Sequence, residues 1–200
     1  MSWIKTIEPQ DADEELGDIY KKIAGPDGQV DNILKAHGLR PHTLQGHMAI
    51  YKAVLHNRGN KLPKYLLELI GVYVSRLNNC RYCVAHHQEG LRKLLENEAG
   101  FDVIIEALDS DVWGDVFDAR EKAALNYARQ LTANPGSINE AAVAVLRDAG
   151  CSDGEILEIN QVTAYFAYAN RTVLGLGVSH EDEELGQSPS SDRPDDWEHQ

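Results

Sequence analysis

The helical spacing of its apolar residues is the strongest constraint on the fold of this chain. In most segments they recur every three to four positions, and almost none alternate as they would in a strand. Short breaks containing Gly, Pro and Asn interrupt the pattern, as at residues 25–28 and 134–136. The sequence therefore predicts an all-α bundle with short connections.

Start and stop signals divide this pattern into individual helices. Asp118 is a candidate N-cap, and two capping boxes are expected, Ser137 with Glu140 and Ser152 with Glu155. We expect helices over residues 11–24, 30–37, 41–56, 63–77, 80–97, 101–107, 118–131, 138–148 and from 152 to about 174.

Length and composition predict one domain followed by a tail. At 200 residues and 42% hydrophobic, the chain can bury a sizeable core without disulfides. We assign residues 1–178 to a single helical domain, with its most informative region at 41–178. Residues 179–200 hold eight acidic residues and one arginine and are rich in Ser and Pro, so we expect a flexible, solvated tail.

Charge and cysteine usage exclude several classes of protein. The net charge of −13 disfavours nucleic acid as a partner, because phosphate binding needs clustered Lys and Arg. No apolar run is long enough to span a membrane and no signal peptide is visible, so we expect a cytoplasmic protein. In a reducing compartment, two closely spaced cysteines among three indicate redox or metal chemistry.

That cysteine pair lies in the run Cys80-Arg81-Tyr82-Cys83, at the start of an expected helix. Unpaired N–H groups and the positive end of the helix dipole favour a thiolate there. His87 follows Cys83 by four residues and lies beside it on the same helix face. The spacing predicts two thiols and an imidazole in one site.

Glu68 is the only charged residue in the apolar segment 65–74. A buried carboxylate there needs a partner, whereas Lys64, Glu68, Gly71 and Ser75 would also fit a plain polar stripe. If the chain reverses at residues 78–79, the two flanking helices run antiparallel, and the rise per residue brings Glu68 near His87. The Glu side chain would then reach the imidazole directly or through one water.

These residues support a peroxidase or disulfide reductase hypothesis. Glu68 would orient His87, which would deprotonate Cys83 for attack on a peroxide, and the resulting sulfenic acid would condense with Cys80. In thioredoxin-type pairs the first cysteine is usually the more acidic, which favours Cys80 as nucleophile, so the order stays open. His86 is a secondary candidate base, although an exposed or capping role is the default expectation.

Two other functions fit parts of the pattern. Cys80, Cys83, His87 and a fourth ligand would suit a tetrahedral zinc ion, but no second paired-ligand motif supplies the remaining donor. A catalytically weak oligomeric scaffold or stress-response protein would keep the motif without turnover. We expect no bound metal and no bound cofactor.

The residues Glu68, Cys80, Cys83 and His87 match the Glu…Cys-X-X-Cys-X-X-X-His pattern of a known family. The chain resembles the AhpD-like alkyl hydroperoxidases of the carboxymuconolactone decarboxylase superfamily, and residues 80–87 are most similar to their "peroxidase-related" branch. The resemblance covers about residues 41–178. Decarboxylases of the superfamily lack the thiol pair, which argues against lactone decarboxylation here.

This resemblance carries implications for the site and its partners. It implies that Cys83 forms the sulfenic acid, that Cys80 is the proton donor and resolving cysteine, and that Glu68 and His87 form a proton relay. It also implies a homo-oligomer, commonly a trimer or hexamer. The expected partners are a hydroperoxide substrate and an external dithiol reductant, either a lipoylated adaptor or a thioredoxin-like protein.

Overall fold

Helices form all the regular structure in the computed structural model, which describes residues 2–25, 28–95, 97–181 and 183–187; no strand occurs in these ranges. The expected all-α class is confirmed. In the same ranges, none of the helices combines the length and apolar character needed to cross a bilayer. The main helices are α1 (Glu14–Ile23), α2 (Asn32–Lys35), α3 (Pro41–Tyr51), α4 (Lys64–Leu77), α5 (Arg81–Leu95), α6 (Glu98–Ser110), α7 (Ala119–Ala133), α8 (Glu140–Asp148) and α9 (Asp153–Leu176).

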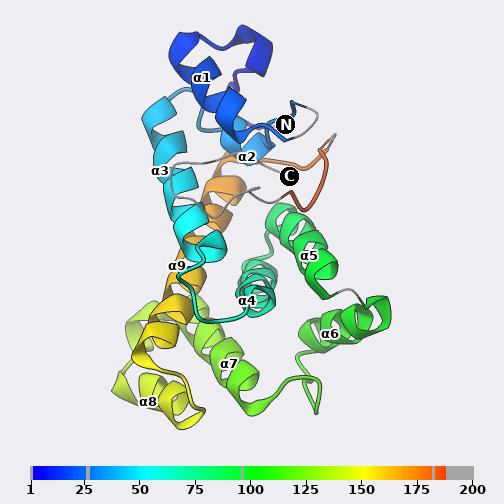
Figure 1. The fold of residues 1–200 in the computed structure, drawn as a ribbon, viewed down its shortest axis with the longest axis vertical. Helices are drawn as coiled ribbons and strands as arrows, with labels where there is room; N and C mark the ends of the chain where they lie inside the picture. Colours follow the sequence, from blue (N-terminus) through cyan, green and yellow to red (C-terminus); the bar gives the residue numbers. More distant parts are fainter. Residues whose placement is uncertain (1, 26–27, 96, 182, 188–200) are drawn as a thin grey trace.

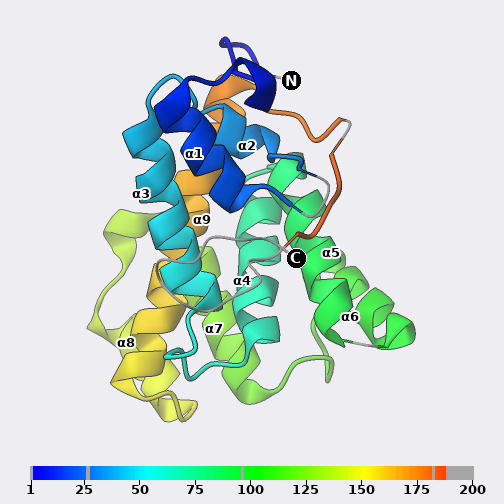
Figure 2. The ribbon, with the colours of Figure 1, turned by 45° about the horizontal axis from the view of Figure 1, so that its top comes forward.

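Helix α4 lies at the centre of the bundle, with α5, α7 and α9 packed against it (Figure 1, Figure 2). All side chains from Leu66 to Ser75 are buried, including the carboxylate of Glu68. A helix that is apolar nearly all round belongs in the interior, which explains this central position. Because Glu68 and Ser75 are buried, the alternative of a solvated polar stripe on this helix is wrong.

A tight turn at Asn78 and Asn79 joins α4 to α5. Asn79 has a left-handed backbone conformation (φ 56°), which asparagine tolerates better than most residues. The backbone N–H of Cys80 then donates to the carbonyl of Ser75 at 2.9 Å, which satisfies a carbonyl at the end of α4. The chain thus reverses directly before Arg81, and α5 packs against α4.

Most of the expected helices are present, with shifts at their ends. The capping box at Ser152 with Glu155 is confirmed, and so is the N-cap at Asp118, which forms a full capping box with Glu121. The expected helix over 41–56 is regular only to Tyr51 and continues as the wider π turn η2 (Lys52–His56). The expected helix over 101–107 is longer, because Asn97 caps α6 three residues earlier.

The capping box expected at Ser137 is wrong. Ser137 ends a short 3-10 turn, η3 (Pro135–Ser137), and its hydroxyl donates to the carbonyl of Asn134 at 2.8 Å. Asn139 caps α8 instead, accepting a hydrogen bond from the N–H of Ala141 at 3.0 Å. Pro135 favours the tight turn. Because of this turn, α8 begins at Glu140, two residues later than the expected start at residue 138.

The chain after α9 returns across the bundle. Gly177 ends α9 in a left-handed conformation (φ 62°), and residues 179–181 and 183–187 then run past α2 to α5 (Figure 1, Figure 2). Asn32 holds the start of this segment through a 2.9 Å hydrogen bond from its amide to the carbonyl of Ser179. The structure differs here from the solvated tail expected from residue 179 on. Residues 182 and 188–200 of that expected tail lie outside the described residues.

Close packing between α4 and α9 gives a test of the fold. A Cβ added at Gly71 would overlap the ring of Phe166, which is fully buried. We expect Gly71→Ala to lower the free energy of unfolding by about 1–3 kcal/mol, because the core must shift to admit the methyl group. Gly46→Ala is the matched control: it adds a methyl group to α3 in open space and should be neutral or stabilise by up to about 1 kcal/mol. Urea unfolding of both variants measures the difference, and equal stabilities would contradict the packing.

Candidate active site

The centre of the site is a buried hydrogen bond between α4 and α5. Glu68 is 3% exposed, and its Oε2 lies 2.8 Å from Nδ1 of His87. Because Nδ1 is occupied by the carboxylate, Nε2 of His87 is left to exchange a proton with another group. Gly90, one turn along α5, keeps the space beside the Glu68 carboxyl group free of a side chain. The proximity of Glu68 and His87 expected from the antiparallel helices is present, as a direct contact.

The two cysteines lie at the beginning of α5 with their sulfurs facing each other. Cys80 directly precedes the helix, and its carbonyl accepts from the N–H of Val84 at 3.0 Å. The Sγ atoms of Cys80 and Cys83 are 3.1 Å apart, and both cysteines are free. This separation is a hydrogen-bond distance, whereas a disulfide would bring the sulfurs to about 2.05 Å. A small movement would join them.

The surroundings of the two sulfurs separate their acidities. A hydrogen bond with Cys83 lowers the pKa of Cys80 and outweighs the opposing effect of burial, and backbone N–H groups of Cys83 and Tyr82 lower it further. The hydrogen bond to Cys80 raises the pKa of Cys83 well above its ordinary value, and burial adds to the rise. The pair therefore shares one proton, with the negative charge held first on Cys80.

The less acidic sulfur, that of Cys83, is the more accessible of the two. Cys83 lines a cavity with about 50 Å³ of space open to water, whereas Cys80 is completely buried and does not line it. The cavity wall also includes Glu68, His87 and the aromatic residues Tyr51 and Tyr165. A cavity of this size holds a few water molecules or one small solute. Cys83 is therefore the sulfur that an entering molecule meets.

Asn170 is a site residue that the sequence did not single out. It is fully buried on α9, and its amide donates to the hydroxyl of Ser75 at 3.1 Å while its carbonyl oxygen accepts from Asn78 at 2.9 Å. The same amide side chain favours the thiolate of Cys83. A carboxamide in an otherwise apolar stretch of α9 was the available signal, but only the folded chain shows that it faces the cysteines.

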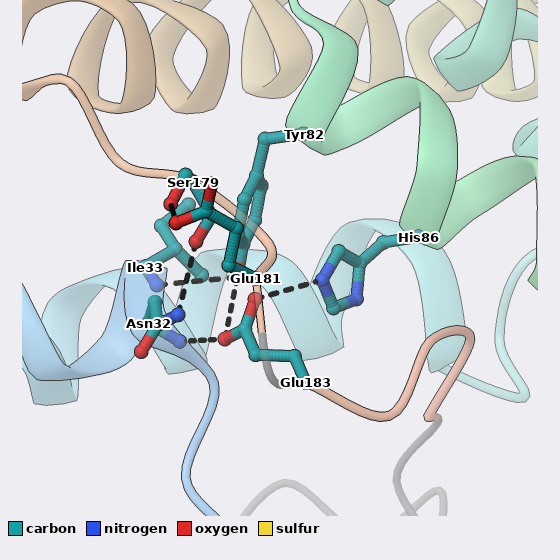
Figure 3. A network of polar contacts seen from close by, with 7 residues as sticks. All are labelled: Asn32, Ile33, Tyr82, His86, Ser179, Glu181 and Glu183. Carbon is teal, nitrogen blue, oxygen red and sulfur yellow. Dashed lines mark hydrogen bonds and ion pairs between the residues drawn. The ribbon is translucent and has the colours of Figure 1, made fainter. Parts of the chain in front are cut away.

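His86 is not exposed, which corrects the default expectation for it. It is buried against Tyr82, with ring centroids 4.5 Å apart, and its Nε2 lies 3.3 Å from Oε2 of Glu183 (Figure 3). His86 also lines the Cys83 cavity, so a part in the site remains open to it. Glu183 comes from the segment expected to be solvated, and this contact could not be foreseen from spacing.

A further buried histidine, His47, also lines the Cys83 cavity. Burial lowers the pKa of His47 to about 3, with smaller contributions from His37 and His87, so its ring is neutral. Tyr165 lies 3.5 Å from Nε2 of His47. Across the part of the chain that the structure describes, no group of three His, Cys, Asp or Glu side chains is placed to hold a metal ion.

Comparisons with known proteins agree with this architecture. Residues 41–130 match the carboxymuconolactone decarboxylase family. The crystal structure of an uncharacterized peroxidase-related protein from Silicibacter sp. TM1040 is 28% identical, with a TM-score of 0.72, over 84% of this chain and 85% of that chain. No curated protein sequence matches the chain.

Two further structures share the fold at lower identity. The alkylhydroperoxidase AhpD core of a peroxidase-related protein from Ralstonia eutropha JMP134 is 24% identical, with a TM-score of 0.78, over 90% of this chain and 93% of that chain. The debrominase Bmp8, solved with 2,3,4-tribromopyrrole, is 17% identical, with a TM-score of 0.69, over 90% and 91% of the two chains. At these identities the likeness concerns the fold alone.

The Glu68–His87 pair gives a test through the acidity of the thiols. In Glu68→Gln the amide carries no charge to stabilise a protonated imidazole, so proton transfer from a thiol to His87 costs more. We expect the apparent pKa of thiol alkylation to rise by about one unit, the usual scale for loss of a close charge partner. Iodoacetamide labelling across pH 5–10 measures it.

The control for this variant is Glu106→Gln, which removes an exposed carboxylate on α6 and should leave the labelling profile in place. If the pH profile of labelling in Glu68→Gln overlays that of the unmodified protein, the carboxylate of Glu68 does not act on the acidity of the thiols.

Proposed function

We propose that the chain is an AhpD-like member of the carboxymuconolactone decarboxylase superfamily and that it acts as a thiol-dependent peroxidase. It would reduce hydroperoxides through a cycle of Cys83 sulfenic acid and Cys80–Cys83 disulfide. The observation that carries this proposal is the placement of two free sulfurs 3.1 Å apart, with Cys83 sharing a cavity with the Glu68–His87 pair.

The first step is formation of the attacking thiolate. Cys83 releases its proton either to the neighbouring Cys80 thiolate or to Nε2 of His87, and Glu68 stabilises the imidazolium in the second case. The amide of Asn170 supports the resulting charge on Cys83. This arrangement reconciles acidity with access, because the more acidic Cys80 serves as proton acceptor while the reachable Cys83 becomes the nucleophile.

The second step is reduction of the peroxide. The Cys83 thiolate attacks one peroxide oxygen, an S–O bond forms, and the O–O bond breaks with its electron pair leaving on the second oxygen. That oxygen takes the proton held by Cys80 or His87 and departs as an alcohol or as water. Cys83 is left as a sulfenic acid, two electrons more oxidised, and the peroxide is reduced by the same two electrons.

The third step closes the disulfide and sets the need for a reductant. The Cys80 thiolate attacks Sγ of Cys83, and the hydroxyl group leaves as water after taking a proton. An external dithiol then returns two electrons and two protons, and we propose a lipoylated adaptor or a thioredoxin-like protein for this role. The cycle requires a compartment that keeps thiols reduced, so we place it in the cytoplasm, and we propose that the protein works as a homo-oligomer.

Substitution of each cysteine tests the cycle. We expect Cys83→Ser to lose peroxide consumption completely, because the hydroxyl of serine cannot form a sulfenic acid. Cys80→Ser should lose sustained turnover but accumulate Cys83 sulfenic acid, since the resolving thiol is gone. Cys151→Ser is the control, because Cys151 is buried away from the cavity, and it should retain turnover. Peroxide loss and dimedone labelling with mass mapping give the readouts.

The reductant is assigned by following peroxide consumption with dithiothreitol, lipoamide or thioredoxin as the electron source. Full activity in Cys83→Ser would refute the proposed role of that sulfur. Failure of a peroxide pulse to give a Cys80–Cys83 disulfide in the unmodified protein would favour a catalytically weak scaffold instead.

A further inference from the structure

The segment 183–187 covers the Cys83 cavity. Gly186 and Gln187 line the cavity directly, and the carboxylate of Glu183 contacts His86, which lines it as well. In Figure 3 the segment passes the start of α2, at Asn32 and Ile33, and the first turns of α5, with Glu183 pointing between them. The route to Cys83 is therefore bounded by residues more than 90 positions later in the sequence.

Glu183 is held in this position by three residues of two helices, α2 and α5. Its Oε1 accepts hydrogen bonds from the backbone N–H of Asn32 and, at 3.3 Å, from the hydroxyl of Tyr82. Its Oε2 lies 3.3 Å from Nε2 of His86. The Glu183 side chain is only 6% exposed. A carboxylate this buried and this fully paired is a built part of the structure, directly behind the cavity-lining residues Tyr82 and His86.

Gly186 docks the other end of the segment. It has φ +71°, and a Cβ added there would lie 3.0 Å from the backbone nitrogen of Gly90 and 2.9 Å from Cβ of Glu89. Lys93 donates a 3.1 Å hydrogen bond to the Gly186 carbonyl. Only glycine permits both the left-handed backbone and the close approach to α5. The segment therefore lies tightly on the helix that carries Cys83.

The charges facing this cavity are mostly negative. Glu68, Asp31 and Glu183 line or border it, together with the imidazoles of His86 and His87. Burial raises the pKa of Asp31 to about 6, and Glu183 adds to the rise, whereas His86 and His87 oppose it. Above that pH, Asp31 adds its charge to the carboxylate of Glu68, which also lines the cavity, and to that of Glu183, which borders it through His86. Lys93, which donates to the Gly186 carbonyl, brings a positive charge to the covering segment.

We propose that Glu183 is a specificity-determining residue that admits small uncharged molecules to Cys83 and repels anions. With the proposed peroxidase function, on which this assignment of substrate class rests, the substrate is hydrogen peroxide or a short uncharged alkyl hydroperoxide. A hydroperoxide that carries a carboxylate, such as that of a fatty acid, would meet the Glu183 charge on its path. Glu183 acts on access and takes no part in the bond-making steps.

A matched pair of alkylating agents tests the proposal without relying on turnover. Iodoacetamide is neutral and iodoacetate is anionic, but both transfer a group of similar size to a thiolate. In Glu183→Gln the wall is kept and the charge is lost, so we expect the iodoacetate-to-iodoacetamide rate ratio at Cys83 to rise about fivefold or more at pH 8. The iodoacetamide rate itself should change by less than about twofold, since the amide can still fill the space.

Two further variants separate the effect of the Glu183 charge from the effect of the position of the segment. Glu184→Gln removes an exposed carboxylate one residue away and should leave the ratio unchanged. Gly186→Ala should undock the segment and accelerate both reagents at Cys83 with little change in their ratio. Cys151 is buried elsewhere, so its labelling in the same samples reports unfolding, and rates are compared only where it stays unmodified.

An unchanged ratio in Glu183→Gln, or an equal rise in Glu184→Gln, would overturn the role of Glu183. Unaltered labelling in Gly186→Ala would overturn the covering position of the segment. Because both reagents react with the same thiolate, the ratio of their rates cancels the acidity of the thiol and reads access to the sulfur, so it can rise in a protein that consumes no peroxide. That result would support the entrance and refute the peroxidase function separately.

Discussion

The hydrogen bond between Glu68 and His87 fixes the relation between α4 and α5, and the site depends on it. An ionised carboxylate in the centre of an apolar helix is costly unless it is paired. The imidazole supplies that partner only if the turn at Asn78 and Asn79 places α5 in one register against α4. The same register puts Cys83 one turn before His87 and beside the same cavity. One buried pair thus ties the stability of the central helices to the chemistry at their interface.

The two thiols divide tasks that a single cysteine could not combine. A fully enclosed sulfur can accept several hydrogen bonds and hold charge, but no solute reaches it, and this is the position of Cys80. Cys83 faces the cavity, where burial and its neighbour oppose ionisation until the proton moves. At 3.1 Å, proton transfer and later bond formation use the same contact. The pair is therefore arranged for a short-lived thiolate at the accessible sulfur.

Local patterns in the sequence predict the parts of this structure that depend on local forces. The N-cap at Asp118, the capping box at Ser152, the antiparallel helices and the meeting of Glu68 with His87 follow from spacing along one or two helices. The capping box predicted at Ser137 is absent because the Ser137 hydroxyl is used in the 3-10 turn that begins at Pro135, where it donates to the carbonyl of Asn134. The burial of His86 and the placement of Asn170 and Glu183 depend on contacts between residues about 90 or more positions apart, and neither periodicity nor composition records those contacts. The composition of an acidic, Ser- and Pro-rich terminus does not indicate that the carboxylate of Glu183 is buried and hydrogen-bonded.

The small cavity and the paired sulfurs place different requirements on the two halves of the proposed cycle. A small oxidant needs only the space in front of Cys83, and excluding larger molecules leaves Cys80 as the nearest group able to react with the sulfenic acid. A protein reductant, in contrast, must reach a disulfide whose first sulfur is completely buried. The contacts of Glu183 and Gly186 stand between that disulfide and the surface. On the proposed function, the strength of those contacts therefore bears on reduction more than on oxidation, because only the reductant is too large to pass beneath them.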